Sequence, residues 1–267
     1  MIDLHAHILP GLDDGACDEA EALEMCRIAA AEGVTAIVAS PHMGGGSAVR
    51  RQDALSATAS LQAAAMRVGI PLRIIPGGDV HAEGDLVARL DAGDFLTIGD
   101  EGKYLLVELN HDMVAPGIED MLFALRLRRL RPIITHPERN PAIQAEPELL
   151  RKLVQAGNAA QVTAGSLTGE FGREAERTAR LVLRRRMAHF VASDAHSTEK
   201  RSPRLRAARR VAEEALGADE ASWIFERRPA QVISGAEVEL PLPADAPRLS
   251  LAGAWNRCGR RVRRMFN

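Results

Sequence analysis

Histidines and acidic residues near the N-terminus have the types and spacing of metal ligands. The chain begins Met1-Ile-Asp-Leu-His5-Ala-His7, and a glycine-flanked acidic turn containing Asp13 and Asp14 follows. Residues i and i+2 of a strand point to the same side, so His5 and His7 can bind one ion. A lone His-x-His pair is weak evidence, because such pairs often arise by chance. The rest of the chain strengthens it, since acidic and imidazole side chains recur at the ends of further predicted strands.

Nine residues with ligand side chains share one place in this pattern, at or shortly after the end of a strand-like run. They are His5, His7, Asp14, His42, Asp79, Glu108, His136, Asp194 and His196. A mixed imidazole and carboxylate set suits zinc, manganese or iron, and nine side chains are too many for one ion. Each residue alone has a structural explanation; Asp14, for example, could cap the following helix. Six such accidents on one rim are hard to accept, so the sequence predicts two or three divalent ions.

The three other histidines are given no ligand role by the sequence. His189 begins a predicted strand and is expected at the rim remote from the site. His81 and His111 are predicted in loops beside the cleft. A single polar residue in such a place is more often structural than functional.

Seven strand-like runs alternate with helical stretches and would position the nine residues. The strands are predicted at residues 2–4, 35–40, 72–77, 104–109, 132–135, 160–163 and 189–193. The helices are predicted at residues 18–32, 53–68, 84–90, 118–130, 147–156, 173–186, 205–216 and 221–226. Strands followed by helices predict parallel β/α units. Because only a closed ring brings six strand ends to one point, we expect a distorted (β/α)7 TIM-like barrel, with an open doubly wound sheet as the alternative.

The composition of the chain indicates its domain organisation and its cellular compartment. The 267 residues are 46% hydrophobic and show no composition break before residue 240, which predicts one barrel over residues 1–240. A net charge of −2 gives no reason to expect nucleic-acid binding. Cysteines stand at 17, 26 and 258 without a CxxC pattern, which is typical of a reduced cytosolic protein. Without a signal peptide or an apolar run of about 18 residues, we expect a cytoplasmic protein.

Residues 241–267 form a separate, basic segment of the sequence. It opens with prolines at 241, 243 and 247, and its apolar positions then recur with a spacing of three and four while arginines crowd the remainder. The apolar positions are Leu251, Trp255, Cys258, Val262 and Met265. This pattern predicts a basic amphipathic helix on the inner face of an anionic membrane. A disordered tail, or a helix packed on a neighbouring subunit of a homo-oligomer, is the alternative.

The motifs resemble those of the PHP (polymerase and histidinol phosphatase) superfamily. More narrowly, they resemble the bacterial manganese-dependent protein-tyrosine phosphatases of capsule and exopolysaccharide loci. The matching motifs are Met1-Ile-Asp-Leu-His-Ala-His-Ile-Leu-Pro-Gly-Leu-Asp-Asp-Gly15, Ser40-Pro-His42, Gly77-Gly-Asp79-Val, Val107-Glu108-Leu, Thr135-His136-Pro-Glu-Arg139, Thr163-Ala-Gly-Ser-Leu-Thr-Gly169 and Ala192-Ser-Asp194-Ala-His196. They occur in the family's order between residue 1 and about residue 240.

The resemblance implies how the ligands divide among three ions. By it, His5, His7, Asp79 and Asp194 would hold the first ion. Asp79, Glu108 and His136 would hold the second, and Asp14, His42 and His196 the third. The chain departs from the family at Asp79, where Glu is usual, and bridging two ions with the shorter side chain needs a closer backbone. Glu83 is a possible substitute.

The same resemblance implies phosphatase chemistry with manganese as the metal. A bound divalent ion lowers the pKa of its water from about 15.7 to roughly 7, which would supply hydroxide to attack a phosphotyrosine. Arg139 and Arg201 follow two of the ligand motifs and would bind the phosphate as guanidinium forks. The substrate implied is a phosphotyrosine protein, in the first place a membrane tyrosine autokinase controlling capsule or exopolysaccharide synthesis.

Other functions remain open from the residues. A PHP phosphatase could act on a small phosphate monoester such as histidinol phosphate. The barrel could also be chiefly a regulatory partner of a membrane kinase. Cys258 and Arg264 match the Cys-x5-Arg spacing of cysteine-dependent phosphatases, but they stand in an arginine-rich run at the chain end, so we take the match as accidental.

Overall fold

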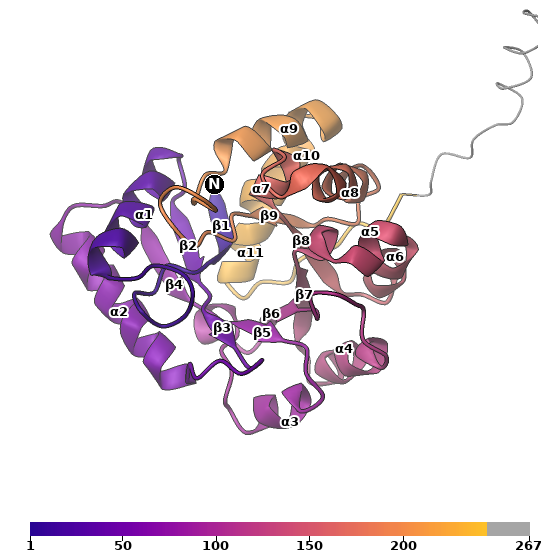
Figure 1. The fold of residues 1–267 in the computed structure, drawn as a ribbon, viewed down its shortest axis with the longest axis horizontal. Coiled ribbons are helices and arrows are strands. Elements are labelled where there is room, and N and C mark those ends of the chain that lie inside the picture. The colour runs from indigo at the N-terminus through magenta and orange to yellow at the C-terminus, as the bar shows by residue number, and fades with distance from the viewer. Residues whose placement is uncertain (245–267) are drawn as a thin grey trace, which may run out of the picture.

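The computed structural model describes residues 1–244 (Figure 1). The predicted amphipathic helix, and with it Cys258 and Arg264, lies outside this range. Within residues 1–244, no helix combines the length and the apolar character needed to cross a membrane.

Nine parallel strands in the described residues form two sheets at the centre of the molecule (Figure 1). The first has the order β1-β2-β4 and the second β3-β5-β6-β7-β8-β9. Their bounds are β1 Ile2–Ala6, β2 Ala36–Ala39, β3 His42–Met43, β4 Arg73–Pro76, β5 Asp79–His81, β6 Tyr104–Glu108, β7 Arg131–Thr135, β8 Ala159–Thr163 and β9 Phe190–Ala192.

Two of the seven predicted strands are interrupted and continue in the other sheet. Pro41 stands between β2 and β3, and it has no N–H for the ladder. Gly77 and Gly78 stand between β4 and β5, where neighbouring side chains approach closely. A Cβ on Gly77 would lie 2.6 Å from Cγ1 of Val38, and one on Gly78 would lie 2.4 Å from Sδ of Met43. Glycine is therefore required where the strand changes sheet.

The ring of strands returns to its start where β9 lies beside β1. Ala6 and Ala195 form a parallel bridge. The Asp194 N–H donates to the His5 carbonyl at 2.8 Å, and the His7 N–H donates to the Ala195 carbonyl at 2.8 Å. The chain thus has the seven-stranded, TIM-like α/β architecture that the sequence predicted, distorted at the two interrupted strands.

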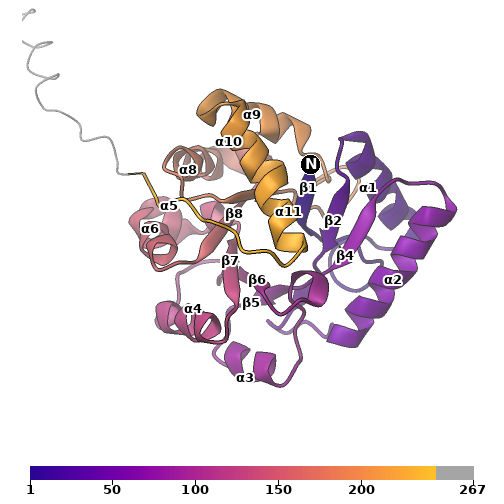
Figure 2. The same cartoon turned by 180° about the vertical axis from the view of Figure 1, so that it is seen from behind.

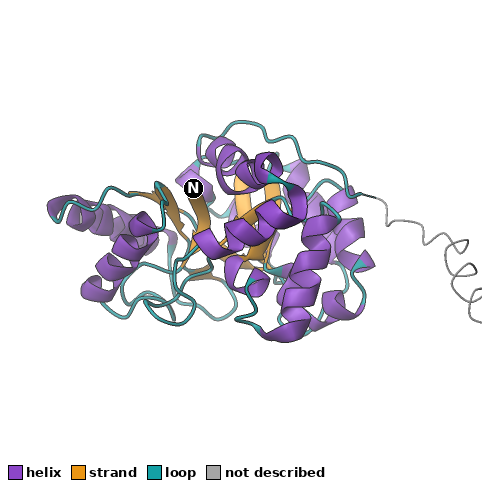
Figure 3. Ribbon diagram, turned by 90° about the horizontal axis from the view of Figure 1, so that it is seen from above, coloured by secondary structure: helices purple, strands orange, loops and turns teal. Residues whose placement is uncertain are grey.

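The helices surround the strands (Figure 3). The α-helices are α1 Glu19–Ala31, α2 Arg51–Arg67, α3 Leu86–Asp91, α4 Ile118–Leu127, α5 Pro141–Ala145, α6 Glu148–Gln155, α7 Ala164–Leu167, α8 Gly172–Arg184, α9 Arg206–Leu216, α10 Ala218–Ser222 and α11 Arg228–Ile233. Short turns η1 Ile98–Asp100, η2 Pro137–Arg139 and η3 Trp223–Arg227 complete the set. The predicted helix at 221–226 is wrong in its bounds, because α10, the π turn η3 and α11 follow one another there. Figure 2 shows α11 lying across the strands when the molecule is seen from behind.

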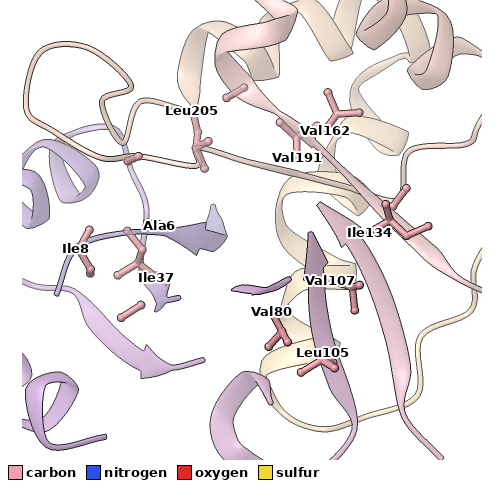
Figure 4. Packing of buried hydrophobic residues seen from close by; sticks show 14 of the residues in the cluster. Ala6, Ile8, Ile37, Val80, Leu105, Val107, Ile134, Val162, Val191 and Leu205 are labelled. Atoms are coloured by element: carbon pink, nitrogen blue, oxygen red, sulfur yellow. The ribbon is translucent and has the colours of Figure 1, made fainter. Parts of the chain in front are cut away.

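Alternation along the strands separates an outer apolar layer from the barrel interior. Figure 4 shows the outer layer, with Val107, Ile134 and Val162 on successive strands. On the inner face of β6, Tyr104 and Leu106 belong to a second apolar cluster, and Glu108 comes next. The inner face therefore becomes polar at the C-terminal end of the strand. The same change on neighbouring strands creates a polar rim above an apolar barrel floor.

Candidate metal centre

All nine predicted ligand residues meet at the C-terminal ends of the strands. Three groups of side chains consist of predicted residues alone. Within each group, the potential ligand atoms lie within 4.8 Å of one another. These groups are His7, Asp14, His42 and His196; His5, His7 and Asp79; and Asp79, Glu108 and His136. Asp194 joins them because its Oδ1 lies 3.5 Å from Nε2 of His5. The structure therefore brings together the nine residues that the sequence predicted as ligands.

His5 and His7 turn their Nε2 atoms toward each other, 3.1 Å apart. His5 lies within β1 and His7 just beyond its end, so the sequence placed β1 two residues too short. Nδ1 of His5 contacts Oε1 of Gln161 at 2.9 Å, and Nδ1 of His7 contacts Oδ2 of Asp13 at 2.7 Å. A hydrogen bond from Nδ1–H leaves Nε2 free to bind a metal.

Asp13 and Gln161 were not recognised from the sequence as supports of the centre. Asp13 also accepts hydrogen bonds from the backbone N–H groups of Gly15 and His42, so it ties the first turn to the next strand pair. A signal for Gln161 existed, because it occupies the inner face of β8 at the level of the ligands. Its role depends on the tertiary contact with His5, which is 156 residues away in the sequence.

Asp14, His42 and His196 form the most exposed part of the centre. Oδ1 of Asp14 lies 3.4 Å from Nε2 of both histidines. The Asp14 side chain is 62% exposed, whereas that of Asp13 is 4% exposed. Asp14 does not cap the following helix, because the side chain of Asp18 accepts the hydrogen bond from Glu21 N at 2.9 Å. The structural explanation for Asp14 is therefore wrong.

Asp79, Glu108 and His136 form a buried part of the centre. Nε2 of His136 lies 3.4 Å from Oε1 of Glu108. Oδ2 of Asp79 lies 3.4 Å from Nε2 of His5 and 3.7 Å from Nδ1 of His42, so Asp79 faces two groups of ligands at once. Glu83, considered from the sequence as its substitute, is exposed and accepts a hydrogen bond from Gly45 N at 3.0 Å. It belongs to none of the ligand groups found in residues 1–244.

Several ligand atoms are buried without a hydrogen-bond partner, which tests whether the residues fit a metal. Asp79 Oδ2, Glu108 Oε2, Asp194 Oδ1, His42 Nδ1 and His196 Nε2 all lack one. Buried polar atoms in proteins normally have such partners, and leaving them unpaired costs stability. Carboxylate oxygens and imidazole nitrogens that converge in this way fit manganese, iron or zinc. We conclude that the donor set suits divalent cations.

The histidines of the centre differ in the direction in which their surroundings shift the pKa. Burial lowers the pKa of His136 to about 4 and that of His196 to about 4, so both imidazoles are neutral and able to donate a lone pair. Burial also opposes protonation of His5, but Asp79 and Asp194 outweigh it and raise its pKa to about 10. A proton on His5 thus balances the two carboxylates in the metal-free protein, where a cation would otherwise do so.

Arg139 and Arg201 both contact Asp194. Nη1 of Arg139 lies 2.5 Å and Nη2 of Arg201 lies 2.8 Å from Oδ2 of Asp194. The Phe171 ring lies below both guanidinium groups, with its centroid 4.4 Å from Cζ of Arg139 and 6.0 Å from that of Arg201. A ring at these distances attracts a cation and limits its movement. The sequence predicted the position of both arginines at the rim but missed Phe171.

Backbone strain accompanies these positions. His136 has φ 34°, Asp194 φ 53° and Arg201 φ 51°, in the left-handed region that such residues rarely adopt. Below His136, the buried Glu138 accepts hydrogen bonds from Ser166 Oγ at 2.6 Å and from Thr163 N at 3.0 Å. Burial raises its pKa to about 7. Glu138 thereby ties η2, which follows His136 directly and ends at Arg139, to the end of β8.

The remaining histidines divide into three cases. His189 is fully buried, and its Nδ1 accepts a hydrogen bond from Ala160 N at 3.1 Å, far from the ligands, as predicted. His111 lies beside the centre and is 69% exposed. His81 was wrongly predicted in a loop: it is the last residue of β5, and its Nε2 lies 3.0 Å from Oε2 of Glu108. The sequence signal missed was its spacing of two from Asp79, the same spacing that selected His5 and His7.

A pocket of about 220 Å³ opens beside the buried part of the centre. It lies between the loops that follow β6 and β7, and Leu109, His136, Pro137 and Arg139 are among its lining residues. The pocket is large enough for an aromatic ring, with ligand and guanidinium groups at one side.

Comparisons with known proteins agree on one family. The family model for capsular polysaccharide synthesis proteins, CpsB/CapC, matches residues 1–234. Tyrosine-protein phosphatase YwqE from Bacillus subtilis is 37% identical over 220 residues, which are 82% of this chain and 86% of that protein. Putative tyrosine-protein phosphatase CapC from Staphylococcus aureus is 31% identical over 204 residues, 75% of this chain and 79% of that protein.

A solved structure agrees with these matches. It comes from work on YwqE from Bacillus subtilis and CpsB from Streptococcus pneumoniae, described as unique metal-dependent tyrosine phosphatases. Its TM-score with this chain is 0.88 at 32% sequence identity, and the match covers 93% of this chain and 100% of that chain.

Proposed function

The chain belongs to the CpsB/CapC family of capsular polysaccharide synthesis proteins, and we propose that it is a metal-dependent protein-tyrosine phosphatase. The predicted resemblance to capsule-locus phosphatases of the PHP type is confirmed at the level of this family. The observation that carries the function is the convergence of nine ligand residues with two arginines on one rim. The relatives YwqE from Bacillus subtilis and CpsB from Streptococcus pneumoniae are named tyrosine-protein phosphatases.

The nine residues would hold two or three divalent ions, and manganese is the metal we propose. When bound, such ions supply Lewis-acid activation of water and neutralise phosphoryl charge. Asp79 faces His5 and His42 with one oxygen, which supports a bridging role for its carboxylate. Gln161 and Asp13 hold the imidazoles of His5 and His7 so that Nε2 faces the centre.

Arg139 and Arg201 would bind the phosphoryl oxygens of the substrate. Their guanidinium groups already lie beside Asp194, and only part of their donors is used there. Planar guanidinium groups match phosphate oxygens in pairs. Phe171 would keep both groups in place when the phosphate enters.

The pocket beside His136 and Arg139 would receive the tyrosine ring. Leu109 and Pro137 offer apolar surface there, and the ring would bring its phosphate to the ligand side. The phenol leaving group has a pKa near 10, so its departure does not require a strong general acid. In agreement with this, the acidic residues at the rim that we have described are assigned as metal ligands or as hydrogen-bond partners of ligands, and none is assigned as a general acid.

We propose further that the substrate is a membrane tyrosine kinase of the capsule or exopolysaccharide system, dephosphorylated at the cytoplasmic face. The support is the family and the basic tail of the sequence. Histidinol phosphate or a related small monoester is the competing substrate.

A direct comparison of substrates tests the proposal. The manganese-loaded protein is given a phosphotyrosine peptide, a phosphoserine peptide and histidinol phosphate, and phosphate release is measured. We expect kcat/KM for the phosphotyrosine peptide to exceed both others at least tenfold. A preference for histidinol phosphate would replace the proposal with the small-molecule phosphatase. Tight binding of the kinase without turnover of any substrate would favour a regulatory partner.

A further inference from the structure

His81 lies on the inner face of β5 and beside Glu108. Asp79 and His81 are two residues apart on one strand, so both side chains point into the barrel rim. The register of β5 and β6 pairs His81 directly with Glu108. The side chain of His81 is 22% exposed, and it is neither free in solvent nor packed in the apolar core.

Three ligand atoms converge at this edge of the centre. Nε2 of His81 is 3.0 Å and Nδ1 of His42 is 3.4 Å from Oε2 of Glu108. Each of the three residues offers a potential ligand atom within 4.8 Å of those of the other two. Yet Oε2 of Glu108 and Nδ1 of His42 are both buried atoms without a hydrogen-bond partner. Two imidazole nitrogens that converge on one carboxylate oxygen have the arrangement of ligands around one ion.

The loop before α2 packs against the His81 ring. A Cβ on Gly45 would lie 2.5 Å from Cδ2 of His81, and the Gly45 φ of +61° also favours glycine. The Gly45 N–H donates to Oε2 of Glu83 at 3.0 Å, which anchors the loop to the turn after β5. The imidazole is therefore held from outside by backbone and faces Glu108 from a fixed direction.

We propose that His81 is a metal ligand, which binds a divalent cation together with Glu108 Oε2 and His42 Nδ1. A neutral imidazole has a single lone pair, so His42 would then serve this cation and not the one beside Asp14. The other oxygen of Glu108 faces Nε2 of His136 at 3.4 Å, so Glu108 would connect this edge to the buried part of the centre. His81 would add a nitrogen ligand to a centre in which the Asp79 side chain is shorter than the glutamate that the family resemblance leads us to expect. The inference rests on the metal centre of the proposed function and extends it beyond the nine residues identified from the sequence.

Metal binding without substrate tests the role of His81. Manganese stoichiometry and affinity are measured by equilibrium dialysis for His81→Ala, His81→Gln and the matched control His111→Ala. His111 is the control because its Nε2 lies 3.8 Å from the other oxygen of the same Glu108, while its side chain is 69% exposed. We expect both His81 variants to lose one ion per chain or to bind one ion at least tenfold more weakly. His111→Ala should match the wild type, and all chelated proteins should melt alike.

Two results would overturn the assignment. One is wild-type stoichiometry and affinity in both His81 variants. The other is an equal loss in His111→Ala, which would indicate a general effect of charge near Glu108. The proposed function fails separately: a wild-type protein that binds manganese but does not hydrolyse a phosphotyrosine peptide refutes the phosphatase and leaves the His81 measurement valid.

Discussion

Arg139 and Asp194 join the proposed phosphate-binding side of the site to its proposed metal side. Nη1 of Arg139 lies 2.5 Å from Oδ2 of Asp194, and Oδ1 of the same carboxylate lies 3.5 Å from Nε2 of His5. One carboxylate thus faces a guanidinium group with one oxygen and the ligand imidazoles with the other. We expect substitutions of the arginines and of the ligands to have separable effects, on turnover of substrate and on metal content.

Replacing either arginine should impair turnover without loss of metal. Arg139→Ala and Arg201→Ala each remove charge-assisted hydrogen bonds worth about 1.5–3 kcal/mol, which corresponds to roughly 10–150-fold in kcat/KM. The measurement is phosphotyrosine-peptide kinetics together with manganese content. Arg204→Ala, at an exposed position of the same segment as Arg201, is the control. Variants whose main defect is lost manganese would show that the arginines only hold Asp194.

Charge at position 79 should matter more than length. Asp79 is fully buried and faces both His5 and His42, so Asp79→Asn removes the charge that offsets two cations and should lower manganese affinity at least tenfold. Asp79→Glu keeps the charge and restores the residue that the family resemblance leads us to expect. We therefore predict that Asp79→Glu retains metal and activity. Equal, mild effects of both changes on manganese binding would exclude a bridging role.

His189 should make the folded protein sensitive to acid. Its Nδ1 accepts from Ala160 N and its Nε2 faces the Pro241 carbonyl at 3.4 Å, an arrangement that requires the neutral ring. Burial lowers its pKa to about 4. As the pH falls below 6.5, this histidine takes up a proton in the unfolded chain before it does so in the folded protein. The free energy of unfolding therefore falls between pH 6.5 and pH 4, by up to about 3 kcal/mol.

The variant His189→Asn isolates this contribution. Urea unfolding with chelator present, at pH 7 and pH 5, should show a smaller loss of stability on acidification in His189→Asn than in the wild type. The control His111→Ala, at an exposed histidine, should keep the wild-type difference. An unchanged pH dependence in His189→Asn would mean that His189 titrates normally in the folded protein.

The basic tail should bind anionic membranes. Each arginine near such a surface adds on the order of 1 kcal/mol, and the attraction weakens with salt. Full-length protein should therefore sediment with anionic vesicles at low salt, while a truncation ending at Ala246 should remain in solution. Equal binding of the two proteins would reject the membrane interpretation of this segment.

The sequence was sufficient to predict much of the fold and to place the predicted ligand residues at one rim, because both depend on local patterns. Buried parallel strands appear as short apolar runs, and a ligand at a strand end follows such a run directly, as Glu108 does after β6. Helices of eleven residues or more, such as α1 and α8, were predicted to within two residues at each end. The four-residue α7 and five-residue α5 have too few residues for a periodic pattern and were missed.

What the sequence did not indicate depends on contacts between distant residues. The interruption at Gly77 and Gly78 hid β5, and His81 was therefore placed in a loop. Gln161 supports His5 only because the ring of strands brings β8 close to β1, with β9 between them. Phe171 has no motif of its own, and its position beneath two guanidinium groups follows from the packing after α7.

The central claim is that these ligands hold the metal on which phosphotyrosine hydrolysis depends. The most direct test removes metal with chelator, adds manganese back, and measures phosphotyrosine-peptide turnover by the wild type and by His5→Ala. We predict that the chelated wild type is inactive and recovers with manganese, and that His5→Ala stays folded, binds less manganese and does not recover. Full turnover by the chelated wild type, or by His5→Ala after manganese addition, would contradict the account.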